Sequence, residues 1–166
     1  MNANEVIANR AIEILGGQKG NYVLVNPNDH VNCGQSTNDV IPTAGKMTSL
    51  RLLKKLKTEL LRLHKALSDK AREFDHVIKM GRTQMQDAVP IRLGQEFRAY
   101  ASAIMRDIRR MDKAMEEMRV LNMGGTAIGT GINADESYLQ RIVPNLSKVS
   151  NMDFEQAADL IDATQN

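Results

Sequence analysis

The sequence predicts an all-α protein, a bundle of long helices, and two observations carry this prediction. Among 166 residues there is no Trp, aromatic residues make up 4%, and Met reaches 10. The core must therefore be built from aliphatic and Met side chains, which suits helix packing better than sheet packing. Two long segments, roughly 41–73 and 94–121, also carry apolar residues that alternate at spacings of three and four, the pattern of a coiled-coil seam.

Both long helices carry more apolar residues than one narrow seam needs. The seam of 41–73 consists of Leu53, Leu56, Leu60, Leu63 and Leu67, and that of 94–121 of Phe97, Ala101, Ile104, Ile108, Met111, Met115 and Met118. Further apolar side chains lie outside these seams: Leu52, Leu61, Met105 and Leu121. They indicate a second packing face shared between subunits, and hence an oligomer; the alternative is that they thicken the core of a monomer.

Shorter elements flank the two long helices. Residues 2–15 are expected to form a helix that stops at Gly16-Gly17, and residues 135–150 a helix kinked at Pro144. The stretches 18–39 and 79–93 are expected to be irregular, the second because Gly81 and Pro90 act as breakers. Residues 122–134 form a glycine-rich turn. No linker or repeat divides the chain, so we treat residues 1–166 as part of one region without an internal boundary.

Both ends of the chain are expected to lie within helices. The first ten residues carry no helix start signal, and EQAADLIDATQN at the other end has no closing glycine. This pattern favours an internal piece of a longer polypeptide.

The charge and cysteine content exclude several classes of protein. The net charge is only +2, from 22 basic and 20 acidic residues, which gives no reason to expect nucleic acid or an acidic membrane as a partner. No apolar run approaches the length of a membrane span, and the start has no secretory signal. The single cysteine, Cys33, forms no internal disulfide, so a reducing cytoplasm is the expected location.

Small hydrogen-bonding residues gather between Asn26 and Asp39, directly before the first long helix. Ser36, Thr37, Asn38 and Asp39 could each cap this helix, but one helix needs one cap. The surplus groups lie where backbone N–H groups and the helix dipole favour an anion. The residues alone therefore predict either a carboxylate-binding site or an elaborate cap, and they do not decide between the two.

A second polar segment, Gly81 to Pro90, joins the two long helices. Thr83 and Gln84 are neutral hydrogen-bonding groups in this connection, and Arg82 or Gln86 could hold them in place. On its own, the segment is better interpreted as a polar connection between helices than as a site.

Together, these segments resemble the aspartase/fumarase superfamily. The stretches NPNDHVNCGQSTNDVIPT and GRTQMQDAVPIRLGQEF are similar, nearly residue for residue, to two of its signature regions, and NMGGTAIGTGIN resembles the glycine-rich turn that follows. The opening MNANEVIANRA also matches, so the resemblance covers essentially the whole chain. It implies a long-helix bundle that assembles as a homotetramer, with each active site built from three subunits.

Two positions favour the aspartase branch of the superfamily over the fumarase branch. The fumarase counterpart of Thr83-Gln84 is Thr-His, whereas Gln84 cannot exchange a proton near neutral pH. Fumarases also more often carry two serines where this chain has Ser36-Thr37. The resemblance thus implies reversible elimination of ammonia from L-aspartate to fumarate through an aci-carboxylate intermediate. The alternatives are a fumarate hydratase or a non-catalytic helical assembly module.

The resemblance also assigns roles to individual residues. It implies that Ser36 and Thr37 bind the β-carboxylate, Asn38 the amino group and Thr83 the α-carboxylate, with Gln84 adjacent. The candidate secondary anion site described for fumarases comprises Asn28, Asp29, His30 and Asn32. The family's general base is a serine on a glycine-serine-serine loop, and this sequence contains no such loop. We therefore expect no catalytic residue in this chain and no activity from it alone.

The remaining candidates have plainer interpretations. The three histidines, His30, His64 and His76, lie in different elements, so no metal site is expected. The resemblance implies that no cofactor is required, although divalent cations activate some members. Cys33 stands where the family often has lysine, and an inert side chain in a tight turn is the favoured interpretation. The turn from Gly124 to Gly131 lacks the Lys-Ser/Thr of a phosphate-binding loop and is interpreted as a hinge and helix terminator.

Overall fold

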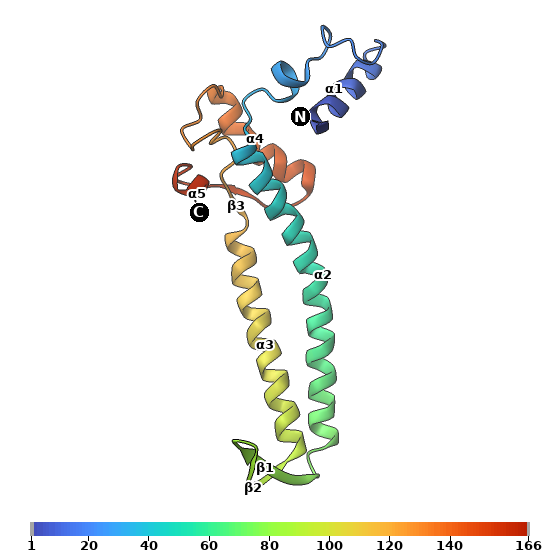
Figure 1. The fold of residues 1–166 in the computed structure, drawn as a ribbon, viewed down its shortest axis with the longest axis vertical. Coiled ribbons are helices and arrows are strands. Elements are labelled where there is room, and N and C mark those ends of the chain that lie inside the picture. Colours follow the sequence, from blue (N-terminus) through green and yellow to red (C-terminus); the bar gives the residue numbers. More distant parts are fainter. Residues whose placement is uncertain (1, 166) are drawn as a thin grey trace. The chain divides into compact units, whose positions relative to one another are not determined.

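The computed structural model describes residues 2–165, which are mainly helical (Figure 1). The all-α prediction is confirmed, with two small two-stranded sheets added. The elements in order are α1 Asn2–Ile14, the π-helix η1 Pro27–Val31, α2 Thr37–Glu73, β1 Ile78–Thr83, β2 Gln86–Arg92, α3 Leu93–Glu117, β3 Val120–Leu121, α4 Glu136–Ser150, β4 Glu155–Gln156 and α5 Asp162–Gln165. Within the described part of the chain, no helix is long and apolar enough to cross a membrane.

The internal packing divides the chain into two compact units. One unit contains residues 1–46 and 119–166, and the other contains residues 47–118. The first 10 residues of α2 belong to the former unit, and the rest of this helix belongs to the latter. The expectation that residues 1–166 form part of one catalytic region remains a prediction.

In the unit 47–118, α2 and α3 run side by side as a helical hairpin (Figure 1). The predicted seam of α3 is confirmed, because Ala101, Ile108 and Met115 are buried at intervals of seven residues.

The predicted seam of α2 is partly wrong. Leu56 and Leu63 are 48% and 45% exposed, whereas Lys57 and His64, one residue further along, are half-buried beside the seam leucines. A lysine is accommodated at the helix contact because its stem packs there while its Nζ lies 2.6 Å from the Asp112 carboxylate of α3.

The stretch 79–93, expected to be irregular, forms an antiparallel hairpin of β1 and β2 instead. Thr83 pairs with Gln86, which leaves a two-residue turn, and both turn residues have positive φ, as in a type I′ turn. Gly81 lies at an irregularity in β1, where a Cβ would come within 2.8 Å of the Val89 carbonyl oxygen. Pro90 is tolerated because both strands of a two-stranded ribbon are edge strands. The two expected breakers thus shape a hairpin.

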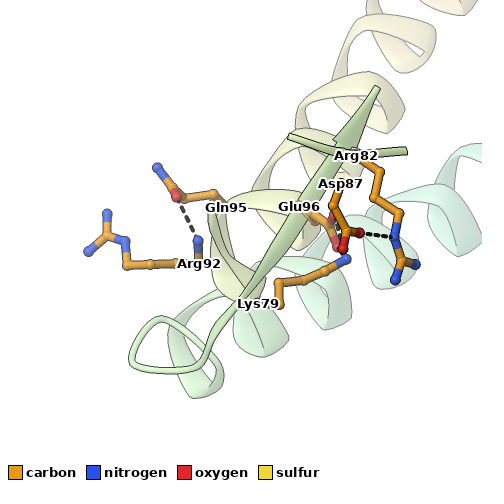
Figure 2. A network of polar contacts seen from close by, with 6 residues as sticks. All are labelled: Lys79, Arg82, Asp87, Arg92, Gln95 and Glu96. Carbon is orange, nitrogen blue, oxygen red and sulfur yellow. Dashed lines mark hydrogen bonds and ion pairs between the residues drawn. The ribbon is translucent and has the colours of Figure 1, made fainter. Parts of the chain in front are cut away.

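An ion pair and a helix cap fasten this hairpin to the start of α3 (Figure 2). Lys79 of β1 places its Nζ 2.8 and 2.9 Å from the two carboxylate oxygens of Glu96. The side chain of Gln95 accepts a 2.9 Å hydrogen bond from the backbone N–H of Arg92, the residue that caps α3. The pair of Lys79 with Glu96 joins β1, the strand that ends at Thr83, to α3.

The other unit is built on short helices and loops. Its core includes Ala8, Ile12, Leu121, Met123, Val143 and Phe154. Helix α1 ends before Gly16 (φ 78°), as expected, and α4 begins at a side-chain cap from Asp135 and contains Pro144. The expected end of the second long helix at residue 121 is wrong, because α3 stops at Glu117. Leu121 lies in β3 instead, fully buried and paired with β4.

Candidate functional site

Ser36 caps α2 through a reciprocal pair of hydrogen bonds. Its Oγ accepts from the backbone N–H of Asn38 at 3.2 Å, and Asp39 Oδ1 accepts from the backbone N–H of Ser36 at 2.9 Å. This is a capping box, and it begins the helix at Thr37 rather than at residue 41. Because the Ser36 hydroxyl is used as an acceptor, its proton is available to donate to a ligand.

The second oxygen of Asp39 binds the glycine-rich turn. Asp39 Oδ2 accepts from the backbone N–H groups of Gly124 at 3.2 Å and Thr126 at 3.0 Å, and the side chain is fully buried. One carboxylate therefore joins the polar segment before α2 to a turn more than 80 residues away. The turn predicted to be a hinge and helix terminator is thus a wall of the candidate site.

Asn38 is oriented by the same turn. Its Nδ2 donates to the carbonyl oxygen of Ala127 at 2.7 Å. This contact uses the donor end of the amide and leaves Oδ1 as an acceptor. An acceptor of this kind suits an ammonium group, which can only donate.

The start of α2 therefore presents both hydrogen-bond donors and an acceptor. Ser36 and the exposed Thr37 bring hydroxyl protons to a helix N-terminus, where an anion is favoured. Asn38 brings an acceptor. Carboxylate-binding donors and an ammonium-binding acceptor on consecutive residues are what an amino-acid ligand requires.

Ala127 lines two cavities near the start of α2. One, of about 440 Å³, is lined by Ser36 and Thr126 together with three of the four predicted secondary-site residues, Asn28, Asp29 and Asn32. The other, of about 640 Å³, is lined by Thr37 and Asn38 together with Thr164 and Gln165. The structure thus brings Ser36 to the secondary-site residues and places Thr37 and Asn38 around a neighbouring cavity.

His30 has a structural contact in η1. Its Nδ1 accepts a 2.9 Å hydrogen bond from the backbone N–H of Asn26, whose side-chain oxygen caps the same short helix. A ring nitrogen that accepts carries no proton, so the imidazole proton lies on Nε2 in this arrangement. His30 does not line the cavity that contains Asn28 and Asp29. The structure therefore agrees with a hydrogen-bonding histidine better than with a catalyst.

Tyr138 of α4 lies against the loop before α2. A Cβ on Gly34 would meet the Tyr138 ring at 3.4 Å. Burial, followed by the negative charges of Asp39 and Cys33, raises the pKa of Tyr138 to about 12. The phenol therefore stays neutral and packs against the loop before α2.

Thr83 and Gln84 belong to the other unit, at the end of β1 and in the hairpin turn, and both are exposed. Gln84 has a φ of 47°, a left-handed conformation that is uncommon for a residue other than glycine. Arg82, which was considered as a support for these residues, pairs with Asp87 instead, at 3.0 Å (Figure 2).

Metal-binding residues are not clustered in the described chain. Among residues 2–165 no group of three or more His, Cys, Asp or Glu side chains is arranged to hold a metal ion. Cys33 is a free, exposed thiol.

A family model described as lyase matches the chain from residue 1 to residue 166. The chain belongs to this lyase family. It is 53% identical, over its full length, to the aspartate ammonia-lyase of Bacillus subtilis, and it spans 35% of that relative. It is also 44% identical, over 98% of its length, to a class II fumarate hydratase of Rhizobium meliloti, of which it again spans 35%.

Solved structures of the lyase family share the fold. The chain matches a Brucella melitensis protein titled fumarate lyase:delta crystallin, crystallised with cobalt, with a TM-score of 0.93 and 49% identity. That match covers 99% of this chain and 36% of the crystallised one. The chain therefore spans about a third of the length of the lyases that it matches.

The sequence pattern does not indicate the contacts of three residues of the candidate site. Asp39 was considered only as a possible cap, whereas its carboxylate also binds the glycine-rich turn. Asn122 and Tyr138 were not considered at all. Asn122 contacts the backbone of Asn38 and the hydroxyl of Thr164, and the ring of Tyr138 lies beside Gly34. These partners are distant in sequence, and no local pattern records such contacts.

Proposed function

We propose that this chain is part of an aspartate ammonia-lyase, which reversibly eliminates ammonia from L-aspartate to give fumarate through an aci-carboxylate intermediate. The observation that carries the proposal is the pairing, on consecutive residues at the start of α2, of hydroxyl donors with the free amide oxygen of Asn38. The identity of 53% to an aspartate ammonia-lyase, against 44% to a fumarate hydratase, supports the same activity.

The reaction places its negative charge where this site offers donors. Removal of a proton beside the β-carboxylate drives charge onto that carboxylate, which Ser36 and Thr37 bind at the N-terminus of α2. Donors fixed in advance by a capping box stabilise this charge without having to reorient. Each such donor contributes on the order of 3–4 kcal/mol to transition-state stabilisation.

The other ends of the substrate are assigned to Asn38, Thr83 and Gln84. Asn38 Oδ1 accepts from the amino group, because Nδ2 is occupied by Ala127. Thr83 binds the α-carboxylate with Gln84 beside it. Asn28, Asp29, His30 and Asn32 are assigned to a secondary anion site. Asn28, Asp29 and Asn32 line the cavity of about 440 Å³, and His30 supports this loop through its hydrogen bond with Asn26.

The complete active site is assembled from several subunits of a homotetramer. The sequence contains no glycine-serine-serine loop to supply the general base, so we assign the base to another part of the full polypeptide and expect this chain alone to be inactive. The reaction needs no cofactor, activation by a divalent cation is compatible with it, and the cytoplasm is the proposed location.

The second candidate is a fumarate hydratase, in which water replaces ammonia. The identity of 44% to a class II enzyme favours it over unrelated activities. Gln84 counts against it, because an amide cannot take the proton-transfer role of the histidine that fumarases carry there. A non-catalytic assembly module is less favoured, because assembly does not require the oriented amide of Asn38.

Replacing Ser36 by Ala in the polypeptide that carries this chain tests the proposal. The variant removes a carboxylate donor together with the side-chain cap of α2, whose loss lowers stability by about 1 kcal/mol. Because the donor is lost, kcat/KM for L-aspartate is expected to fall roughly a hundredfold or more. Steady-state production of fumarate measures this change. Ser102→Ala, at an exposed position of α3, is the matched control and should leave kcat/KM unchanged. Equal kcat/KM values for Ser36→Ala and the parent protein would refute the assignment.

A further inference from the structure

Pro42 removes one backbone hydrogen bond from α2. In an α-helix the N–H of each residue donates to the carbonyl oxygen four residues earlier, and proline has no N–H. Pro42 lies inside α2, so the carbonyl of Asn38 loses its α-helical donor. Asn38, the residue proposed to bind the substrate's amino group, therefore has a backbone carbonyl that lacks its α-helical hydrogen bond.

Asn122 supplies the missing donor from the glycine-rich turn. Its Nδ2 donates to the carbonyl oxygen of Asn38 at 3.0 Å and to Oγ1 of Thr164 at 3.2 Å. The side chain is 2% exposed, and Thr164 is itself fixed by a 2.7 Å hydrogen bond to the carbonyl of Leu160. Asn122 is thus held in place, with its donors directed at Asn38 and Thr164.

The two contacts act on opposite ends of Asn38. Asn122 holds its backbone carbonyl, and the carbonyl of Ala127 holds its side-chain Nδ2. Both contacts come from one short turn, which is fastened in turn to Asp39. A change at Asn122 therefore shifts the backbone of Asn38 relative to Ala127 and reorients the amide oxygen.

We infer that Asn122 is a positioning residue, which directs the amide oxygen of Asn38 toward the amino group of the substrate. The inference rests on the proposed function, since it concerns the group that departs as ammonia. Asn122 does not contact the substrate. Its effect is therefore confined to recognition of the nitrogen, and the binding of the carboxylates is left to Ser36 and Thr37.

The addition of ammonia to fumarate separates these two kinds of recognition. With the complete polypeptide, the KM for ammonium chloride is measured at saturating fumarate, and the KM for fumarate at saturating ammonium chloride. Asn122→Ala is expected to raise the KM for ammonium roughly tenfold, the change for a lost hydrogen bond of about 1.4 kcal/mol. The KM for fumarate should stay near its original value. Asn145→Ala, an exposed asparagine on α4, is the matched control.

Pro42 provides a rescue that a purely structural role would not predict. Pro42→Ala restores the helical N–H that donates to Asn38, so Asn122→Ala combined with Pro42→Ala should recover most of the lost affinity for ammonium. Asn122→Leu keeps the approximate size of the side chain, removes the donor and places no charge in the buried turn, and it replaces Asn122→Ala if the alanine variant fails to fold.

Three results would overturn the inference. Equal rises in both KM values would show a general loss of structure, and an unchanged KM for ammonium, or no rescue by Pro42→Ala, would show that Asn122 does not position Asn38. A parent protein that hydrates fumarate and ignores ammonium would instead refute the proposed function, and the inference with it.

Discussion

At the scale of single residues, the carboxylate of Asp39 holds the candidate site together. It is fully buried and accepts from three backbone N–H groups, those of Ser36, Gly124 and Thr126. Buried charges are tolerated when several donors satisfy them, and removing the acceptor leaves each donor unpaired. This one side chain therefore fixes both the cap of α2 and the turn that orients Asn38.

Asp39→Ala is expected to lower the free energy of unfolding by about 3 kcal/mol or more, because two buried N–H groups and one part-buried N–H group lose their acceptor. Asp39→Asn, which keeps one oxygen, should cost less. Denaturant unfolding monitored by circular dichroism measures both changes. Asp153→Ala is the control, since its side chain is 100% exposed, and it should shift stability by no more than about 0.5 kcal/mol. A shift as small for Asp39→Ala would contradict this role.

The raised pKa of Tyr138 predicts a loss of stability at alkaline pH. Its pKa is raised to about 12 in the folded state, first by burial and then by the charges of Asp39 and Cys33, from about 10 in an unfolded chain. The stability that neutral Tyr138 contributes is fully present below pH 10 and is lost as the pH rises toward 12, because the unfolded chain releases the proton first.

Tyr138→Phe should remove this alkaline loss. Its hydroxyl is buried and has no hydrogen-bond partner within the described residues, so the variant should also gain up to about 1 kcal/mol at neutral pH. Melting temperatures between pH 7 and pH 11 test both statements, with the exposed Tyr100→Phe as control. A Tyr138→Phe variant that loses stability at neutral pH would show that the Tyr138 hydroxyl makes a stabilising hydrogen bond, and would contradict this prediction.

At this scale, the sequence predicted the candidates but not their contacts. Ser36, Thr37 and Asn38 could be singled out because capping residues were in surplus before a helix. Which of them caps depended on Asp39, and the orientation of the Asn38 amide depended on Ala127, far along the chain. Local propensity contains no information on such distant backbone partners.

At the scale of elements, the helices were predictable and their faces and ends less so. Apolar spacing located both long helices, but it did not show which side of α2 is turned toward α3. Leu56 and Lys57 are neighbours on adjacent faces of α2, and the ion pair between Lys57 and Asp112 turns the Lys57 face toward α3. The hairpin of β1 and β2 was missed because its turn residues, Gln84 and Met85, are not the glycine or asparagine that such turns favour.

The start of α3 packs closely against the end of α2 at Gly94. A Cβ there would lie 2.3 Å from the Ala71 carbonyl oxygen and 2.7 Å from the Asp75 Cα. Gly94→Ala is therefore expected to destabilise the protein by several kcal/mol, although alanine favours helix by about 1 kcal/mol.

Gly45→Ala is the matched control for this element. Gly45 also lies within a helix, but a Cβ there meets nothing within 4 Å, so the propensity gain of about 1 kcal/mol should appear in full. If the packing at Gly94 is as described, thermal unfolding should give a lower melting temperature for Gly94→Ala and a higher one for Gly45→Ala. A stabilising Gly94→Ala would show that the two helix ends are further apart.

At the scale of the whole molecule, an uncovered apolar face supports assembly. Leu52, Leu56 and Leu63, at spacings of four and seven, share one face of α2 and are 57%, 48% and 45% exposed. Exposed apolar strips of this kind commonly mark interfaces. The homotetramer with shared active sites remains a proposal for the full polypeptide, of whose relatives this chain spans about a third.

The central claim is that the site selects an amino group. Its most direct test offers L-aspartate and L-malate in parallel to the complete polypeptide and follows the ultraviolet absorbance of fumarate. Fumarate is expected from L-aspartate alone, because Gln84 supplies no titrating group in the place of the histidine that fumarases carry. Fumarate from L-malate alone would contradict it and would identify the lyase as a fumarate hydratase.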